Sequence, residues 1–281
     1  MTVKLFEWSE DRSAELTVQS VVGINLDEIE QDERDRQLGL ARAEALAAEA
    51  SVGIALLRNI AAAMLKHKET DAPVTFSTEH LDAVSRTLVS EVLGCGEVSG
   101  QVSEPAPMQI QESVYPGLWR VKSAMRADAP ECLIIADIPP LLRFHAHKSI
   151  DPTMRINKER EGVMNALPVL AEIRDHVKGY VSGGSNHVIN FTLLPMSEAD
   201  MALMRETLGA GHVDMLSKGY GKCRVCSTRW PNVWSVQFFN AMDTIILDSL
   251  EVGDVPVSVR AAGDDFVDSG ARILEVIEAY L

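Results

Sequence analysis

The chain has 281 residues, of which 46% are hydrophobic, and a formal net charge of −15 at pH 7. This composition excludes a wholly disordered protein, because it supplies enough apolar side chains to build a core. The negative charge argues against unaided binding to nucleic acid or acidic membranes, whose phosphates would be repelled. No apolar run approaches the roughly 20 residues of a membrane helix, and the first residues lack a signal-peptide pattern. The sequence therefore predicts a cytoplasmic protein without membrane insertion.

The two ends of the chain differ in character. Residues 1–36 are acidic and finish with LDEIEQDERDR, which predicts a mobile or loosely packed N-terminal arm. The Ala-rich stretch 38–67 predicts one or two helices. Near the other end, Phe266, Ile273 and Ile277 recur at helical spacing, so residues 263–281 are expected to form an amphipathic C-terminal helix.

The middle of the chain contains an internal repeat at an offset of 115 residues. The matching positions are Phe76 and Phe191, Glu91 and Glu206, Leu93-Gly94-x-Gly96-x-Val98 and Leu208-Gly209-x-Gly211-x-Val213, Tyr115 and Trp230, Pro116 and Pro231, Trp119 and Trp234, and Val121 and Val236. A slip of two residues upstream aligns Leu57 and Ile60 with Leu170 and Ile173. A shift of four residues downstream aligns LIIAD (133–137) with TIILD (244–248).

Each copy predicts the same order of elements: a helix, a short strand, a second helix, a glycine turn and two or three antiparallel strands. Ser197-x-x-Asp200 resembles a capping box at the start of one second helix, and the first glycine of each LG-x-G suits a helix C-cap. The expected fold class is α+β, with two tandem copies forming a pseudo-symmetric two-lobed protein plus the C-terminal helix. We expect the lobes at 37–148 and 149–262. Packing of the copies, or a symmetric homodimer, would cover the exposed sheet edges.

Cys223-x-x-Cys226 could form a redox or metal site. Tetrahedral zinc needs two more ligands, and the chain has no second C-x-x-C. A thioredoxin-like pair opens a helix, whereas the following STRWPNVWSVQFF predicts a turn and a strand. At the offset of 115 the matching residues are Met108 and Gln111, so the scaffold does not need the thiols. Buried or idle thiols are favoured over a partner or metal contact, and that contact over redox catalysis.

Other candidate sites are weak. His145-x-His147 could place two imidazoles on one strand face, but no carboxylate lies nearby in the sequence. Gly94-x-Gly96 follows a helix, the reverse of a dinucleotide-binding turn. No catalytic Ser/His/Asp pattern is present, so the sequence predicts no enzyme activity, no cofactor and no metal site.

The aromatic residues have two interpretations. Tyr115, Trp119, Trp230 and Trp234 recur near predicted strands, where core filling is the favoured role. The alternative is an exposed interaction surface, because tryptophan and tyrosine often anchor interfaces.

Several stretches resemble the HupH/HyaF family of hydrogenase expression proteins. They are LGCGEVSG, IQESVYPGLWRV, MNALPVLAEIRD, INFTLLPMSEADMALM, LGAGHVDMLSKGYGKCRV, STRWPNVWSVQFFNAMDTIIL and LEVGDVP, and the resemblance spans roughly residues 50–275. It implies a non-catalytic accessory protein of nickel–iron hydrogenase maturation. The implied partner is the precursor of the iron–sulfur small subunit, held before export, with other hydrogenase accessory proteins as further partners.

Two expectations follow from the resemblance. The acidic chain would complement a precursor that bears a twin-arginine leader. The contact region is expected on polar or flexible stretches beside the repeated strands, at Gln111, Glu112, Trp119, Tyr220, Cys223, Arg224, Trp234 and Asn240. The alternative is nickel delivery or thiol-redox chemistry through Cys223 and Cys226, although the seven histidines form no His-rich tract.

Overall fold

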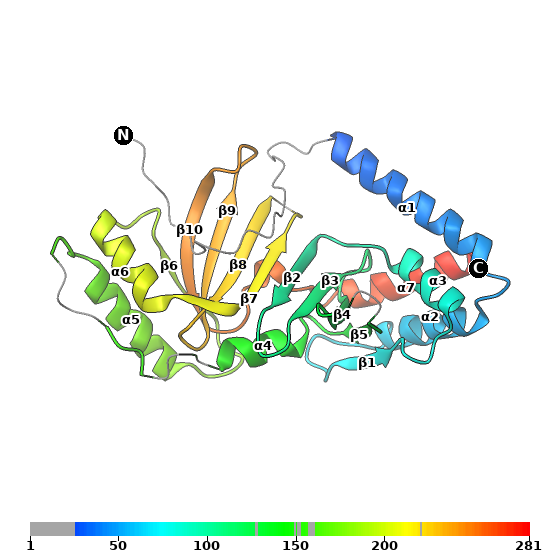
Figure 1. Ribbon diagram of the computed structural model, residues 1–281, viewed down its shortest axis with the longest axis horizontal. Helices are drawn as coiled ribbons and strands as arrows, with labels where there is room; N and C mark the ends of the chain where they lie inside the picture. The colour runs from blue at the N-terminus through cyan, green and yellow to red at the C-terminus, as the bar shows by residue number, and fades with distance from the viewer. Residues whose placement is uncertain (1–25, 127–128, 149, 151–152, 157–160, 220) are drawn as a thin grey trace. The chain divides into compact units, whose positions relative to one another are not determined.

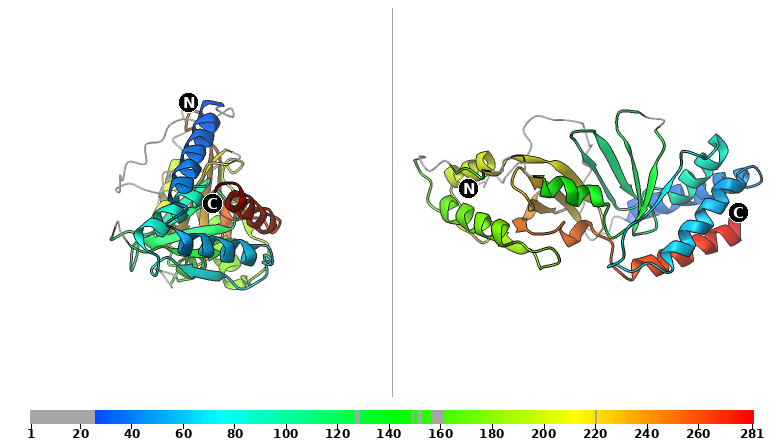
Figure 2. Two further views of the ribbon diagram at one scale, coloured as in Figure 1. Left: turned by 90° about the vertical axis from the view of Figure 1, so that its right-hand side faces the viewer. Right: turned by 90° about the horizontal axis from the view of Figure 1, so that it is seen from below.

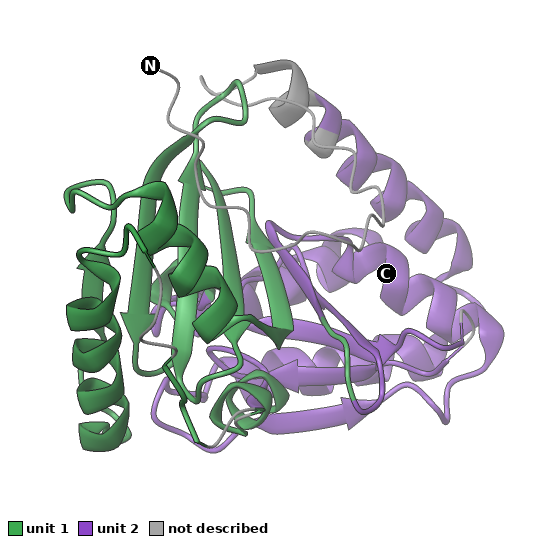
Figure 3. Ribbon diagram, turned by 60° about the vertical axis from the view of Figure 1, so that its left-hand side comes forward, with its two compact units in different colours: residues 1–23, 102–104, 141–259 green, residues 24–101, 105–140, 260–281 purple. Residues whose placement is uncertain are grey.

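The computed structural model describes residues 26–281 except 127–128, 149, 151–152, 157–160 and 220. It divides into two compact units, drawn in different colours in Figure 3. The described part of unit 1 comprises residues 102–104 and 141–259. That of unit 2 falls within 24–101, 105–140 and 260–281. The predicted lobes, 37–148 and 149–262, are each continuous, whereas each compact unit also takes in a later or earlier stretch of the chain.

The described part of unit 2 contains four helices and five strands. In chain order they are α1 (Leu26–Leu46), α2 (Ser51–Met64), β1 (Val74–Ser77), α3 (Ala83–Leu93), β2 (Val98–Val102), β3 (Met108–Glu112), β4 (Leu118–Ser123), β5 (Cys132–Ile135) and α7 (Asp265–Tyr280). The strand order is β1-β5-β4-β3-β2. β5 pairs antiparallel with both β1 and β4, and β4 with β3.

Unit 1 contains α4 (Pro140–His147), α5 (Ala166–Gly179), β6 (His187–Asn190), α6 (Glu198–Leu208), β7 (Ala210–Ser217), β8 (Lys222–Thr228), β9 (Val233–Phe239), β10 (Ile245–Val252) and the 3₁₀ turn η1 (Val257–Val259). Its strand order is β7-β8-β9-β10-β6, with antiparallel pairing throughout. The α+β class is therefore confirmed. Four strands follow each LG-x-G segment, so the expectation of two or three was too low.

Each unit has its own apolar core. In unit 2, α2 and α7 lie side by side (Figures 1 and 2), and α7 contributes Phe266, Ile273 and Ile277 to a core with Leu57 and Ile60 of α2. In unit 1, α5 and α6 lie next to each other, and their apolar faces pack with Trp230, Val233 and Leu250. Burial of these amphipathic faces, rather than intrinsic propensity, stabilises the helices.

Local sequence signals explain where the helices end. Ser197 and Asp200 form the predicted capping box at the start of α6, since the Ser197 side chain accepts from the Asp200 N–H and the Asp200 side chain from the Ser197 N–H. Gly94 and Gly209 are the C-caps of α3 and α6 at φ angles of 53° and 56°, a region where glycine is favoured. The structure confirms both predictions.

The strand registers of the two units correspond closely. Trp119 of β4 lies opposite Glu112, and Trp234 of β9 lies opposite Ser227, so both pairs keep the offset of 115. The pairing with the last strand of each unit, β5 or β10, has a different offset. Trp119 lies opposite Ile134 of β5, whereas Trp234 lies opposite Glu251 of β10. This register corresponds to an offset of 117, and the predicted alignment of 133–137 with 244–248 is wrong. The β4–β5 and β9–β10 connections differ in length. The offset that aligns the preceding strands therefore cannot also align the last strands.

The corrected offset aligns IADIP (135–139) with VGDVP (252–256). Both stretches also serve the same contact: the Trp119 indole N–H donates to the Ala136 carbonyl at 2.9 Å, and that of Trp234 to the Gly253 carbonyl at 3.4 Å. The two units thus correspond in the order of their strands and in the registers of the strand pairs. The pseudo-symmetry of the two units as superposable copies stays a prediction.

Two ion pairs join segments that are distant in sequence. In unit 2 the Arg260 Nε donates to Asp137 Oδ2 at 2.8 Å, and the Ala261 N–H donates to the Asp137 carbonyl at 2.9 Å. In unit 1 the Arg143 guanidinium donates two hydrogen bonds to Asp254, at 2.8 and 2.9 Å. Each aspartate lies just after the last strand of its unit. The Arg260–Asp137 pair ties the 260–281 segment to the rest of unit 2, and the Arg143–Asp254 pair ties together the two ends of the 141–259 stretch of unit 1.

The remaining sequence expectations differ in outcome. The Ala-rich stretch forms the two helices α1 and α2, and α7 occupies most of the predicted C-terminal helix. Residues 1–25 of the predicted acidic arm lie outside the described residues, and 26–36 belong to α1. His145 and His147 lie on α4, not on a strand, so residues two apart point in different directions. Within the described part of the chain, no helix is both long and apolar enough to cross a bilayer.

Candidate functional site

The predicted contact region is divided between the two units. Gln111, Glu112 and Trp119 lie in unit 2, on β3 and β4. Cys223, Arg224, Trp234 and Asn240 lie in unit 1, on β8, on β9 or just after β9. Tyr220 lies outside the described residues. Within each unit these residues fall on neighbouring strands, so the structure brings them together as two groups.

The aromatic members of the region are buried. Trp119 and Trp234 are 0% and 1% exposed, and the neighbouring Tyr115 and Trp230 are 0% exposed. Their side chains fill the cores of the units, the role favoured for them by the sequence pattern. An exposed aromatic surface at these four positions is therefore not present in this conformation.

Gln111 and Glu112 hold two different turns in place, the first at Gly96 and the second at Gly117. The Gln111 side-chain amide donates to the carbonyls of Gly96, Val98 and Glu112 at 2.9 to 3.2 Å. Glu112 is only 5% exposed, and its carboxylate accepts from the Gly117 N–H at 3.3 Å. Burial raises the pKa of Glu112 to about 7, and the negative charges of Glu97 and Asp265 act in the same direction.

Cys223 and Cys226 lie on opposite faces of β8. Successive strand residues alternate between faces, so residues three apart point in opposite directions and stand about 10 Å apart. Cys223 is buried beside Ser258, with its Sγ 3.5 Å from the hydroxyl oxygen. Cys226 Sγ lies 3.3 Å from Asp214 Oδ1. A disulfide or a shared metal ion would require both thiols on one side, so β8 cannot supply either.

The surroundings also keep both thiols protonated. Burial raises the pKa of Cys223 to about 11. Burial and the Asp214 carboxylate raise the pKa of Cys226 still further. Because the thiolate is the nucleophile and the metal ligand, these environments oppose both kinds of reactivity.

Arg224 and Asn240 also have local polar roles. The Arg224 guanidinium donates two hydrogen bonds to Asp214, at 2.8 and 3.0 Å, across the β7–β8 pair. Asn240 Oδ1 accepts from the N–H groups of Met242 and Thr244, which shapes the β9–β10 turn. Both side chains, like that of Gln111, keep part of their surface accessible.

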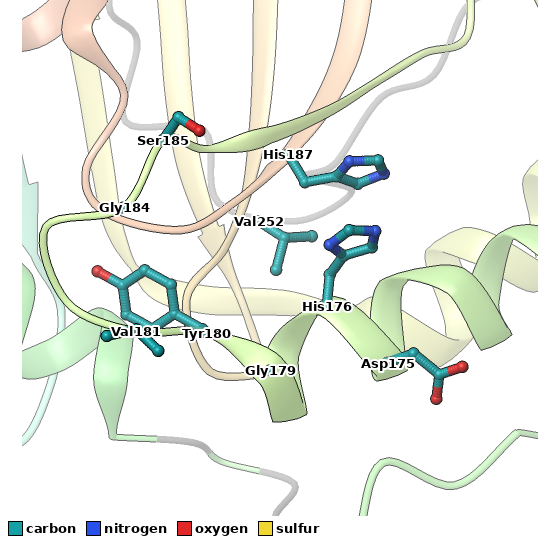
Figure 4. Close-up of a pocket in the computed structure, with 9 residues that line it drawn as sticks. All are labelled: Asp175, His176, Gly179, Tyr180, Val181, Gly184, Ser185, His187 and Val252. Carbon is teal, nitrogen blue, oxygen red and sulfur yellow. The ribbon is translucent and has the colours of Figure 1, made fainter.

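A cluster of metal-ligand residue types, which the sequence reasoning missed, lies elsewhere in unit 1. Glu172 and His176 are four residues apart on α5, and His187 begins β6. One ligand atom from each of the three lies within 4.8 Å of the others. His187 Nε2 is 2.7 Å from Glu172 Oε1. The imidazoles of His176 and His187 stack with centroids 3.5 Å apart (Figure 4).

The cluster borders a cavity of about 420 Å³. The cavity is lined by Asp175, His176, Gly179, Tyr180, Val181, Gly184, Ser185, His187 and Val252. Spacing of four on one helix could have indicated the Glu172–His176 pair. The approach of His187 could not be predicted, since the α5–β6 loop separates it from His176.

Comparison with known proteins points to one family. The sequence model described as "HupH hydrogenase expression protein, C-terminal conserved region" matches residues 163–280. The "Hydrogenase expression/formation protein HupH" of Rhizobium leguminosarum bv. viciae is 41% identical over 80% of this chain and 81% of its own. HoxQ of Cupriavidus necator, with the same description, is 40% identical over 70% of this chain and 71% of its own.

A more distant sequence relative agrees. The "Hydrogenase-1 operon protein HyaF" of Escherichia coli K12 is 32% identical over 71% of this chain and 70% of its own. The solved structure of a HupH hydrogenase expression protein from Thiobacillus denitrificans is 29% identical to 42% of this chain, covers 96% of its own chain and gives a TM-score of 0.38.

Proposed function

The chain belongs to the HupH/HyaF family of hydrogenase expression proteins, and from this membership we propose that it is a non-catalytic accessory protein of nickel–iron hydrogenase maturation. The observation that carries the proposal is the 41% identity to a hydrogenase expression/formation protein over 80% of the chain. The proposed client is the precursor of the iron–sulfur small subunit, held in the cytoplasm before export.

The charge of the chain supports a basic client segment. A net charge of −15 attracts a cationic leader and repels polyanions. If the attraction is electrostatic, affinity for the precursor falls as salt is added, because exposed charges are screened beyond about 8 to 10 Å at physiological ionic strength. An affinity that does not change between low and high salt would remove this support.

We place the client contact at the partly exposed members of the predicted region, Gln111, Arg224 and Asn240. Their buried neighbours Glu112, Trp119, Cys223 and Trp234 would support those strands from within. We further propose that the two units are copies of one ancestral α+β unit. The equal strand orders and the shared offset of β3–β4 with β8–β9 support this origin.

The thiol-based alternative has less support. A redox or nickel site that uses Cys223 together with Cys226 would need both side chains on one face of β8, and the alternation of the strand separates them. The raised pKa of each thiol acts against the same alternative. A binding role therefore fits this part of the chain better than thiol chemistry.

Affinity purification tests the proposed client. Tagged full-length chain is recovered from cells that carry or lack the hydrogenase structural genes, and bound proteins are identified by mass spectrometry. We expect the small-subunit precursor, with its leader intact, only when those genes are present. Recovery of the large subunit instead, or of no hydrogenase subunit, would contradict the assignment.

A charge-matched pair of variants tests the proposed surface. Arg224→Gln removes a charge at the predicted contact, while Arg58→Gln removes an equal charge from an exposed position on α2. We expect Arg224→Gln to raise recovery of the precursor at low salt, because it removes the cation that pairs with Asp214 and so strengthens the attraction for a basic leader. Arg58→Gln should leave recovery unchanged, and thermal melting checks that both variants are folded.

A further inference from the structure

We propose that Glu172, His176 and His187 form a binding site for a divalent transition-metal ion such as Ni²⁺ or Zn²⁺. The inference goes beyond the proposed chaperone role, because it holds whichever client the chain binds. It depends on three observations: the ligand atoms of these residues are close together, their backbones are anchored in the core of unit 1, and a cavity adjoins them.

The proximity of the ligand atoms is the first observation. They lie within 4.8 Å of one another, and His187 Nε2 is already 2.7 Å from Glu172 Oε1. Around an ion with bonds of about 2.0 to 2.2 Å, tetrahedral ligand atoms stand about 3.4 Å apart. Side-chain movements of about an ångström would therefore bring all three into coordination range.

The second observation is the rigidity of the supporting backbone. Glu172 and His176 share the outer face of α5, while Leu170 and Ile173 on its inner face are 0% exposed. His187 lies opposite the buried Val252 in the β6–β10 pair. The core thus fixes the three Cα positions, and only the side chains need to adjust.

The stacked rings define the adjustment that the ion requires. The imidazole planes differ by 5° and their centroids stand 3.5 Å apart, so their in-plane lone pairs lie in separate, nearly parallel planes and cannot both point at one ion. At least one ring must rotate about χ2, a broad torsion for histidine. The ion would also replace the hydrogen bond between His187 and Glu172. Metal binding is consequently expected to break the stack.

The donor set and the cavity indicate which ions fit. Two imidazoles and one carboxylate suit nickel, zinc, cobalt or copper, whereas magnesium and calcium prefer oxygen ligands alone. Three protein ligands leave at least one coordination position open, as in exchangeable or catalytic sites. The cavity of about 420 Å³ offers space for a ligand there. Asp175 also lines the cavity, but its carboxylate points away from the two rings (Figure 4).

Isothermal titration of the untagged full-length chain with Ni²⁺, Zn²⁺ or Mg²⁺ tests the proposal. We expect one saturable site for Ni²⁺ and Zn²⁺, and no competition from millimolar Mg²⁺. His176→Gln and His187→Gln should each weaken Ni²⁺ binding at least tenfold. His80→Gln, at an exposed histidine in unit 2, is the matched control and should leave binding unchanged.

X-ray absorption of the nickel-loaded protein provides a second, independent measurement. Imidazole scattering without sulfur is the expected result, and it should disappear in the double variant His176→Gln/His187→Gln. The proposal fails if no stoichiometric ion binds, if that double variant binds as tightly as the parent protein, or if sulfur ligates the ion. Circular dichroism confirms that each variant is folded before its result is counted.

Discussion

Asp137 accepts a hydrogen bond at 2.8 Å from Nε of Arg260, although 123 residues of chain separate them. Asp254 and Arg143 form the corresponding pair in unit 1, with the order of acid and base along the chain reversed. Asp137 and Asp254 hold the same position in IADIP and VGDVP. Arg143 follows IADIP by a few residues, and Arg260 follows VGDVP by a few residues. The arginine of each pair thus follows the last strand of the other unit. Arg260 follows β10 but pairs with Asp137 in unit 2, and Arg143 follows β5 but pairs with Asp254 in unit 1.

Arg260→Ala should lower the free energy of unfolding by about 2 kcal/mol. The change removes the guanidinium whose Nε donates to the Asp137 carboxylate, a side chain that is only 9% exposed, and poorly compensated buried charge is costly. Arg143→Ala is the matched comparison, because its pair with Asp254 is more exposed, at 36% and 25%. We expect a loss of about 1 kcal/mol there. Urea denaturation measures both, and a larger loss for Arg143→Ala would contradict the prediction.

Glu112→Gln should stabilise the protein at alkaline pH. The pKa of Glu112 is raised from 4.5 to about 7 in the folded state, so folding favours the protonated form. Its contribution to stability is complete below pH 4.5 and is lost as pH rises through 7. Glutamine cannot ionise and escapes that loss. The variant should therefore gain up to about 3 kcal/mol at pH 8 and nothing at pH 4.

Urea denaturation of the parent protein and Glu112→Gln at pH 4, 6 and 8 gives the difference directly. Asp248→Asn provides a comparison in unit 1, since burial raises the pKa of Asp248 from 3.8 to about 6. The gain in stability of Asp248→Asn over the parent protein should develop at lower pH, as pH rises from 3.8 to about 6. Equal stability of Glu112→Gln and the parent protein at pH 8 would show that the buried carboxylate is not destabilising.

Three of the four cysteines, Cys95, Cys223 and Cys226, should differ widely in reactivity. Cys95 is exposed, while Cys223 is buried and Cys226 has its thiol in contact with Asp214. Alkylation with iodoacetamide at pH 8, followed by peptide mass mapping, should modify Cys95 at least tenfold faster than Cys223 or Cys226, whose raised pKa values disfavour the thiolate. A peptide with a disulfide between Cys223 and Cys226 would overturn the assignment of these thiols to opposite faces.

Gly96→Ala should destabilise unit 2 by about 2 to 3 kcal/mol. A Cβ at Gly96 would collide with the Ser113 carbonyl and approach the Glu112 carbonyl to 3.2 Å, and neither backbone atom can move freely. Gly179→Ala is the control, because a Cβ there meets nothing within 4 Å. Thermal unfolding should show a clear loss for the first variant and a change of at most about 0.5 kcal/mol for the second.

The sequence could predict the parts of the fold that contain no insertion. An offset of 115 residues relates α3 to α6 at both ends, and β3–β4 to β8–β9 in register, because the segment from helix to hairpin has the same length in both units. The last strand was misaligned because its preceding turn varies in length. The aspartate common to IADIP and VGDVP would have given the correct alignment.

The candidate sites were harder to predict, for physical reasons. A tryptophan in a strand can point to either face, so the pattern alone could not decide whether Trp119 and Trp234 were exposed. The same alternation separated Cys223 from Cys226 despite their short spacing. Conversely, His176 and His187 stack although a loop separates them in sequence. Proximity across a loop depends on how α5 packs against β6, which local spacing does not record.

The location of α7 in unit 2 determines when that unit can fold during synthesis. Phe266, Ile273 and Ile277 belong to a core whose other members come mainly from the first half of the chain. A ribosome must therefore release α7 before this core can close, by which time the 141–259 stretch has already emerged. The unit whose strands are translated first thus waits for a helix that is made after unit 1.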